Sequence, residues 1–70
     1  MEMQSVSSSN LAAIGYDYDT ATLRIEFLKS GLYEYYGVPV DVYDGLFGAS
    51  SKGTYFDQHI KKAGYSYSKC

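Results

Sequence analysis

The chain is 70 residues long, carries a net charge of −2 and contains one cysteine, one histidine and nine tyrosines. This length holds one small domain with a thin core. A single Cys with a single His excludes both an intrachain disulfide and a closed four-ligand metal site, so we expect no cofactor. No apolar run is long enough to span a membrane. The N-terminal residues lack the basic and apolar regions of a signal peptide. A lone thiol is typical of a reducing compartment. We therefore expect a cytoplasmic protein with no membrane partner.

The N-terminal segment, residues 1–9, is polar, rich in serine and without periodicity, so we expect it to be flexible. The remaining residues, 10–70, form the single predicted domain. Its first predicted strand is the apolar run of residues 11–16, which ends in an aspartate-containing turn. The second predicted strand, residues 22–28, alternates strictly between apolar and polar side chains. This alternation indicates a strand with one buried face.

A hairpin joins the second predicted strand to a third. The segment Lys29-Ser30-Gly31 predicts a three-residue loop, with Gly31 at the position that requires positive φ. Such a loop would place Ile25 opposite Tyr35 and would give the hairpin one apolar and one polar face. The apolar face would carry Leu23, Ile25, Phe27, Tyr33 and Tyr35, and the polar face Arg24, Glu26, Glu34 and Tyr36.

Two helices are predicted after the third strand. Pro39 suits the first position of a helix, which we expect to run for about ten residues and to stop near Gly48. The second helix should begin at Ser50 or Ser51, which are both good N-caps, and end at Gly64. Their apolar stripes are Val42, Tyr43, Leu46 and Phe47, and then Phe56, Ile60 and Ala63. The order predicts an α+β fold, a three-stranded antiparallel meander followed by two helices packed on one face (β-β-β-α-α), with the other face open.

Two segments of the chain resemble the KTSC family. Tyr33 and Tyr35 match the central Tyr-x-Tyr of that family, and Ser51-Lys52-Gly53 matches its Ser-Lys-Gly run, within a resemblance that covers about residues 8–67. The family takes its name from a segment at the C-terminus of some lysyl-tRNA synthetases, and it also occurs as free-standing small bacterial proteins. The resemblance therefore implies RNA binding, by association with a synthetase. This chain departs from its relatives in carrying lysines instead of arginines after the last helix, which weakens bidentate phosphate recognition.

The clearest candidate site is a positive surface that begins at the second predicted helix. Residues 1–51 hold two basic and seven acidic side chains, whereas residues 52–70 hold four basic and one acidic. A serine cap, a lysine and a glycine at a helix start can bind an anion; the alternative is an ordinary serine cap with the lysine in solvent. Lys52, Tyr55, His59 and Lys62 should form one stripe along the helix. The predicted contact residues are Ser51, Lys52, Gly53, Tyr55, His59, Lys61, Lys62, Tyr65 and Tyr67.

The tyrosines of the third predicted strand allow two interpretations. Tyr33 and Tyr35 could stack on nucleobases, but their place on the apolar face favours a core role, with each hydroxyl bonded to a neighbouring carbonyl or carboxylate. Tyr36 points the other way and is the better candidate for an exposed ring. A lone histidine such as His59 is more often structural than functional.

No acid–base pair, nucleophile–base pair or phosphate-binding glycine loop occurs in the sequence, so we expect a protein that is not an enzyme. We expect a binding module for RNA, a nucleotide or another phosphate-bearing ligand. The alternative is an interaction module that works as a homo-oligomer, for example a phage or mobile-element protein that binds a host protein or sequesters a nucleotide. The salt dependence of binding distinguishes these two interpretations. Binding through phosphates weakens steeply as the salt concentration rises, whereas association through an apolar interface does not.

Overall fold

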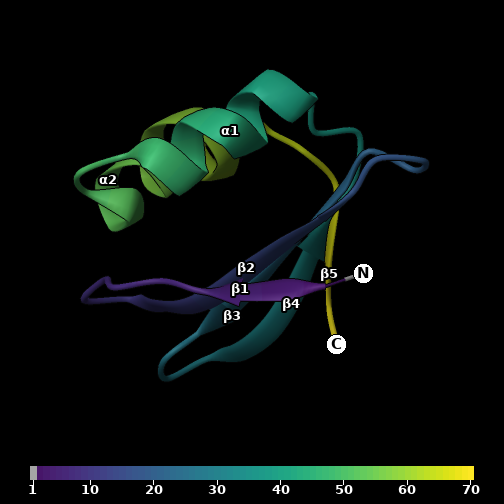
Figure 1. Ribbon diagram of the computed structural model, residues 1–70. Helices are drawn as coiled ribbons and strands as arrows, with labels where there is room; N and C mark the ends of the chain where they lie inside the picture. Colours follow the sequence, from purple (N-terminus) through teal and green to yellow (C-terminus); the bar gives the residue numbers. More distant parts are fainter. Residues whose placement is uncertain (1) are drawn as a thin grey trace.

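The computed structural model describes residues 2–70 and has an α+β architecture, in which an antiparallel sheet carries the helical segments on one face (Figure 1). Its five strands lie in the order β1-β2-β3-β4-β5. The strands are β1 (Met3–Ser5), β2 (Leu11–Asp17), β3 (Thr22–Phe27), β4 (Gly31–Tyr35) and β5 (Tyr67–Lys69). The helices are α1 (Val40–Gly48) and α2 (Lys52–Phe56), and α2 continues into a π-helical turn, η1 (Asp57–Lys61). Among residues 2–70 no helix has the length and apolar character needed to cross a bilayer.

The antiparallel sheet and the two helices confirm the predicted fold class, but the prediction of three strands was wrong. The predicted meander corresponds to β2, β3 and β4, and one short strand is added at each edge. In β1, Gln4 pairs with Ile14, and in β5, Tyr67 pairs with Tyr35. These edge strands have three residues each and are mostly exposed, so their pairing depends on docking against the meander rather than on local periodicity. The flexibility expected for residues 1–9 stays a prediction.

The hairpin between β3 and β4 keeps the predicted faces with a different register. The structure pairs Ile25 with Tyr33, where Tyr35 was predicted, because the loop consists of residues 28–30 and Gly31 already pairs with Phe27. Gly31 has a φ of 92° and closes the turn as the first residue of β4. The shift equals two residues, and side chains alternate with a period of two, so Tyr33 and Tyr35 stay on the apolar face.

The core lies between the sheet and the helices. Its fully buried members include Ile14, Leu23, Ile25, Leu46 and Ile60. Phe56 is also buried, as predicted, and Phe27 packs against this cluster at its margin. Together these residues join β2, β3, α1 and the α2–η1 segment into one core.

Two residues predicted to be buried are exposed instead. Phe47 has 47% of its surface exposed at the end of α1. Ala63 is exposed because η1 is a wider π-helical turn, in which Lys62 N–H donates to Asp57 O over five residues at 3.1 Å. The wider turn changes the direction of the side chains after Ile60, so the spacing that buries Phe56 and Ile60 does not continue to Ala63.

Packing between α1 and α2 depends on a glycine in the middle of α1. A Cβ atom built on Gly45 would lie 2.7 Å from Tyr55 Cζ and still closer to the Tyr55 hydroxyl oxygen. Gly45 therefore weakens the helix by intrinsic propensity while it gives the hydroxyl end of the Tyr55 side chain room to contact α1. The Tyr55 ring in turn lies 4.3 Å from the His59 ring.

The face of the sheet turned away from the helices is not covered by any helix of the described chain (Figure 1). Arg24 on β3 and Glu34 on β4 are paired on this face and form an ion pair, with Arg24 Nε donating to Glu34 Oε2 at 2.9 Å. The hydrogen bond from Arg24 lowers the pKa of Glu34. Tyr36, predicted to be an exposed ring, is 40% exposed and donates from its hydroxyl to Glu34 Oε1 at 3.3 Å.

Candidate functional site

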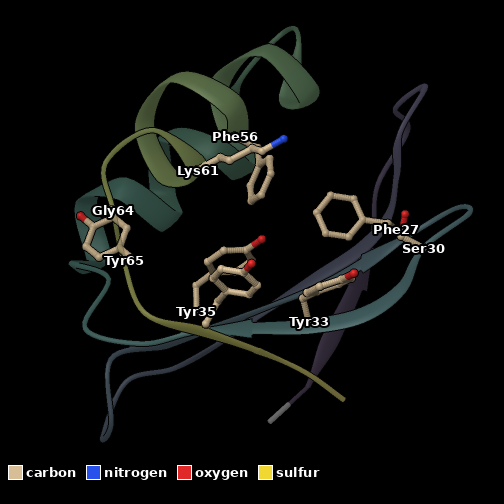
Figure 2. A pocket seen from close by; sticks show the side chains of 9 residues that line it. Phe27, Ser30, Tyr33, Tyr35, Phe56, Lys61, Gly64 and Tyr65 are labelled. Carbon is tan, nitrogen blue, oxygen red and sulfur yellow. The ribbon is translucent and has the colours of Figure 1, made fainter.

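A cleft of about 420 Å³ opens between the inner face of the sheet and the α2–η1 segment. Figure 2 shows Tyr33 and Tyr35 on the sheet side of this cleft, with Phe56 and Lys61 on the helix side. We call it the aromatic cleft, and the residues that line it are Phe27, Ser30, Tyr33, Tyr35, Phe56, Lys61, Gly64, Tyr65 and Tyr67.

The rings of the aromatic cleft are held by contacts with one another. The Tyr35 ring meets the Phe56 ring edge to face, with centroids 5.4 Å apart and an interplanar angle of 74°. On its other side Tyr35 stacks with Tyr67 at 5.4 Å and 27°. The Phe27 ring meets Phe56 and Tyr33 edge to face, at 5.2 and 5.5 Å. Such ring pairs stabilise each other beyond the area they bury, so the walls of the cleft are preformed.

Exposure differs greatly among these rings. Tyr35 is 7% exposed and belongs to the core, Tyr33 is half-buried, and Tyr67 has 62% of its surface exposed. Tyr67 belongs to an edge strand that pairs on one side only, with β4. A flat ligand can therefore reach Tyr67 without disturbing the core.

The hydroxyl groups of Tyr33 and Tyr35 do not fulfil the sequence expectation. The side-chain hydrogen bonds found within residues 2–70 include none from either hydroxyl to a protein group. Burial, followed by the neighbouring Tyr67 and Tyr33, raises the pKa of Tyr35. Figure 2 shows its hydroxyl directed into the cleft, where it can donate to a ligand.

Two lysines provide positive charge at the cleft. Lys61 lines it from the C-terminal end of η1, and the salt bridges found within residues 2–70 do not include Lys61. Lys69 on β5 places its Nζ 5.8 Å from the centroid of the Tyr33 ring, within range of a cation–π contact. The cleft thus combines aromatic faces with a free ammonium group at its rim.

The predicted anion site at the start of α2 lies in a separate polar hollow of about 350 Å³. Ser51 is the N-cap residue, but its hydroxyl donates to Thr54 Oγ1 at 2.9 Å and makes no cap bond to the helix backbone. Lys52 Nζ donates to Ala49 O at 3.0 Å. A Cβ on Gly53 would lie 2.9 Å from Asn10 Nδ2, so the glycine accommodates the Asn10 side chain.

The nine predicted contact residues do not form one site. Lys61, Tyr65 and Tyr67 line the aromatic cleft, whereas Ser51, Lys52 and Gly53 line the polar hollow together with Ser7, Ser8, Ser9 and Ser50. The predicted stripe is divided as well. Tyr55 and His59 pack against each other beside α1, and Lys62 pairs with Asp57, with Nζ 3.4 Å from Oδ2.

Sequence reasoning did not include five further aromatic or polar positions among the predicted contact residues, namely Phe27, Ser30, Tyr33, Tyr35 and Phe56. Phe27 and Phe56 were assigned to the core because their spacing is periodic, and this assignment is correct for their inner surfaces. The missing information was the pairing of β5 with β4, which brings Tyr67 beside Tyr35. The alternation of tyrosine and serine over residues 65–68 was the available signal.

Comparisons with known proteins agree on one family. The family model for the KTSC domain matches residues 7–65. A crystal structure of a KTSC domain protein from Yersinia pestis superimposes with a TM-score of 0.94 at 40% identity, covering 99% of this chain and 96% of that one. An uncharacterized protein of Stutzerimonas stutzeri is 37% identical over 67 residues, 96% of this chain and 94% of its own length. A lysine–tRNA ligase of Nostoc is 43% identical over 53 residues, which are 76% of this chain and 9% of the ligase.

Proposed function

This chain belongs to the KTSC domain family, and on that premise we propose that it is a small non-catalytic module that binds single-stranded RNA through the aromatic cleft. One observation carries the proposal: six aromatic rings and Lys61 gather around one accessible opening. Aromatic side chains bind unstacked bases by their faces, and lysines bind the phosphates that connect them. The lysine–tRNA ligases among the relatives, which bear the name of an enzyme that charges tRNA, favour RNA over other ligands.

Tyr67 is the ring that we propose as the stacking platform. It is the most exposed ring of the cleft, and Tyr35 supports it from behind at 5.4 Å. A base lying on Tyr67 would extend this stack outward. The Tyr35 hydroxyl, directed into the cleft, is available as a donor to the base or its ribose.

The charge distribution predicts weak, salt-sensitive binding. Lys61 at the rim and Lys69 above Tyr33 supply the positive charge, within a chain whose net charge is −2. With two cations in contact, log K should fall with log salt at a slope of about −1.4, from roughly −0.7 per phosphate on a single strand. We expect dissociation constants in the micromolar range or weaker at physiological salt.

The test is a titration of the full chain with fluorescein-labelled oligouridine, followed by fluorescence anisotropy at several salt concentrations. Truncating Tyr67 to Ala should lower the affinity roughly tenfold, since one stacked base contributes about 1–3 kcal/mol. The matched control is Tyr18→Ala, because Tyr18 is another exposed tyrosine, at 70%, and lies outside the cleft. Equal affinity losses in both variants, or no binding by wild type at low salt, would contradict the proposal.

The second candidate, a homo-oligomeric interaction module, is favoured by a different cluster of rings. Tyr18 and Phe47 are exposed by 70% and 47%, and they are connected through Tyr16 and Tyr43, with neighbouring centroids 5.0–6.2 Å apart. Light scattering over a range of concentrations tests it. A concentration-dependent mass that Phe47→Ser abolishes would support self-association, whereas a constant monomeric mass would remove it.

The cytoplasmic location expected from the sequence remains part of the proposal. It rests on the single cysteine, which leaves no partner for an intrachain disulfide. An RNA ligand is consistent with that compartment.

A further inference from the structure

A second hollow of about 460 Å³ adjoins the aromatic cleft. The two hollows share four lining residues, Phe27, Ser30, Phe56 and Lys61. The Phe27 and Phe56 rings, edge to face at 5.2 Å and 71°, therefore lie between the two adjoining hollows, which together we call the groove. Each part alone lies within the range of roughly 300–1,000 Å³ that is typical of small-molecule sites.

The chemistry of the second hollow differs from that of the cleft. Its own lining, outside the shared residues, contains Lys29 in the hairpin loop and the side-chain amide of Asn10 beside that loop. The Asn10 side-chain amide does not occur in the hydrogen bonds found within residues 2–70, so its donor and acceptor are both available. Asn10 can read the edge of a base with both groups, whereas the aromatic cleft offers mainly ring faces.

The boundary between the two hollows carries a positive charge, in addition to Lys29 in the second hollow. Lys61 lines both hollows and lies outside the ion pairs found within residues 2–70. Asp57 also lines the second hollow, but its carboxylate lies 3.4 Å from Lys62 Nζ and is partly neutralised. A ligand that fills both hollows would therefore carry its negative charge between them.

We propose that the groove binds two consecutive nucleotides of a single strand, with one base in the aromatic cleft, the next base beside Asn10, and the phosphate that links them at Lys61. This inference rests on the proposed function and specifies which part of the ligand occupies each hollow. It makes the dinucleotide, rather than the isolated nucleotide, the unit of recognition. Lys29 faces the second nucleotide and adds attraction for the phosphate that follows it.

The test compares two probes on the full chain by calorimetry at low salt: uridine 5′-monophosphate and the dinucleoside monophosphate UpU. Both probes carry one phosphate, and the diester of UpU carries less negative charge than the monoester of uridine 5′-monophosphate, so tighter binding of UpU reports the second nucleoside rather than charge. We expect UpU to bind roughly tenfold more tightly. Asn10→Ala should remove this advantage and leave binding of the mononucleotide unchanged.

Two lysine variants examine the boundary independently. Lys61→Gln should weaken UpU binding several-fold, whereas the matched control Lys52→Gln should not, because Lys52 lines neither hollow and its replacement leaves the Lys62–Asp57 pair intact. Equal affinities of the two probes for wild type would overturn the inference, and so would UpU binding that is insensitive to both Asn10→Ala and Lys61→Gln.

Failure of the two-nucleotide inference can be distinguished from failure of the proposed function. If the mononucleotide binds and Tyr67→Ala abolishes that binding while UpU gains nothing, the aromatic cleft remains a nucleotide site and the two-nucleotide register is wrong. If neither probe nor oligouridine binds, the proposed function itself is wrong.

Discussion

Replacing Gly45 by Ala should destabilise this protein, although the same change in the interior of a helix usually stabilises it. Alanine is favoured over glycine in a helix by about 1 kcal/mol. At this position, however, the new Cβ would lie 2.7 Å from Tyr55 Cζ and closer still to the hydroxyl, and overpacking of this kind costs about 1–3 kcal/mol. The net expectation is a loss of about 1 kcal/mol, or roughly 4–8 °C in melting temperature for a domain of this size.

Gly48 provides the matched control within the same helix. A Cβ at Gly48 meets no heavy atom within 4 Å, so Gly48→Ala should be neutral or stabilising by up to about 1 kcal/mol. In a Tyr55→Ala background the clash is absent, and Gly45→Ala should become stabilising, which gives a coupling energy of about 2 kcal/mol. Thermal and urea unfolding measure these values. If Gly45→Ala and Gly48→Ala raise the melting temperature equally, the packing of Tyr55 on α1 is wrong.

Two further predictions concern polar groups that the fold has placed in pairs. The Tyr16 hydroxyl donates to the buried Val38 O at 2.5 Å, so Tyr16→Phe should lower the free energy of unfolding by about 1–2 kcal/mol. The control Tyr18→Phe, at an exposed ring, should change the free energy of unfolding little. Equal effects of the two variants in urea unfolding would contradict this prediction. Hydrogen bonds from Arg24 lower the pKa of Glu34 below its ordinary value of 4.5. The ionised carboxylate therefore stabilises the fold above about pH 4.5, and this stabilisation is lost as the pH falls through the lowered pKa. An NMR titration should show a midpoint for Glu34 below 4.5 that returns toward 4.5 in Arg24→Gln, and an unchanged midpoint in the variant would refute the assigned cause.

The meander and both helices could be predicted because their information is local. Alternation in residues 22–28 indicated which face of β3 is buried, and Gly31 indicated the turn. The register was wrong by two residues, since the residue that starts β4 is decided by the turn conformation of Gly31 itself. Because that error is an even number of residues, the assignment of faces held.

The candidate site could be predicted only in part. The lysine-rich segment after residue 51 contains Lys61 and Tyr67, which line the cleft. Helical spacing failed beyond Ile60, because the π-helical turn η1 changes the direction of the following side chains. Helical spacing also could not show that Lys62 forms an ion pair with Asp57.

The sequence by itself determined the fold class, the apolar face of the meander and the approximate limits of both helices, because periodicity, turn residues and helix ends act over a few neighbouring positions. Only the tertiary structure decided the pairing of the edge strands, the packing of Tyr55 against α1 at Gly45, and the formation of the aromatic cleft. The cleft exists because β5 pairs with β4 and brings Tyr67 onto Tyr35 from 32 positions away in sequence. Contacts between such distant residues depend on the whole chain and leave no local pattern.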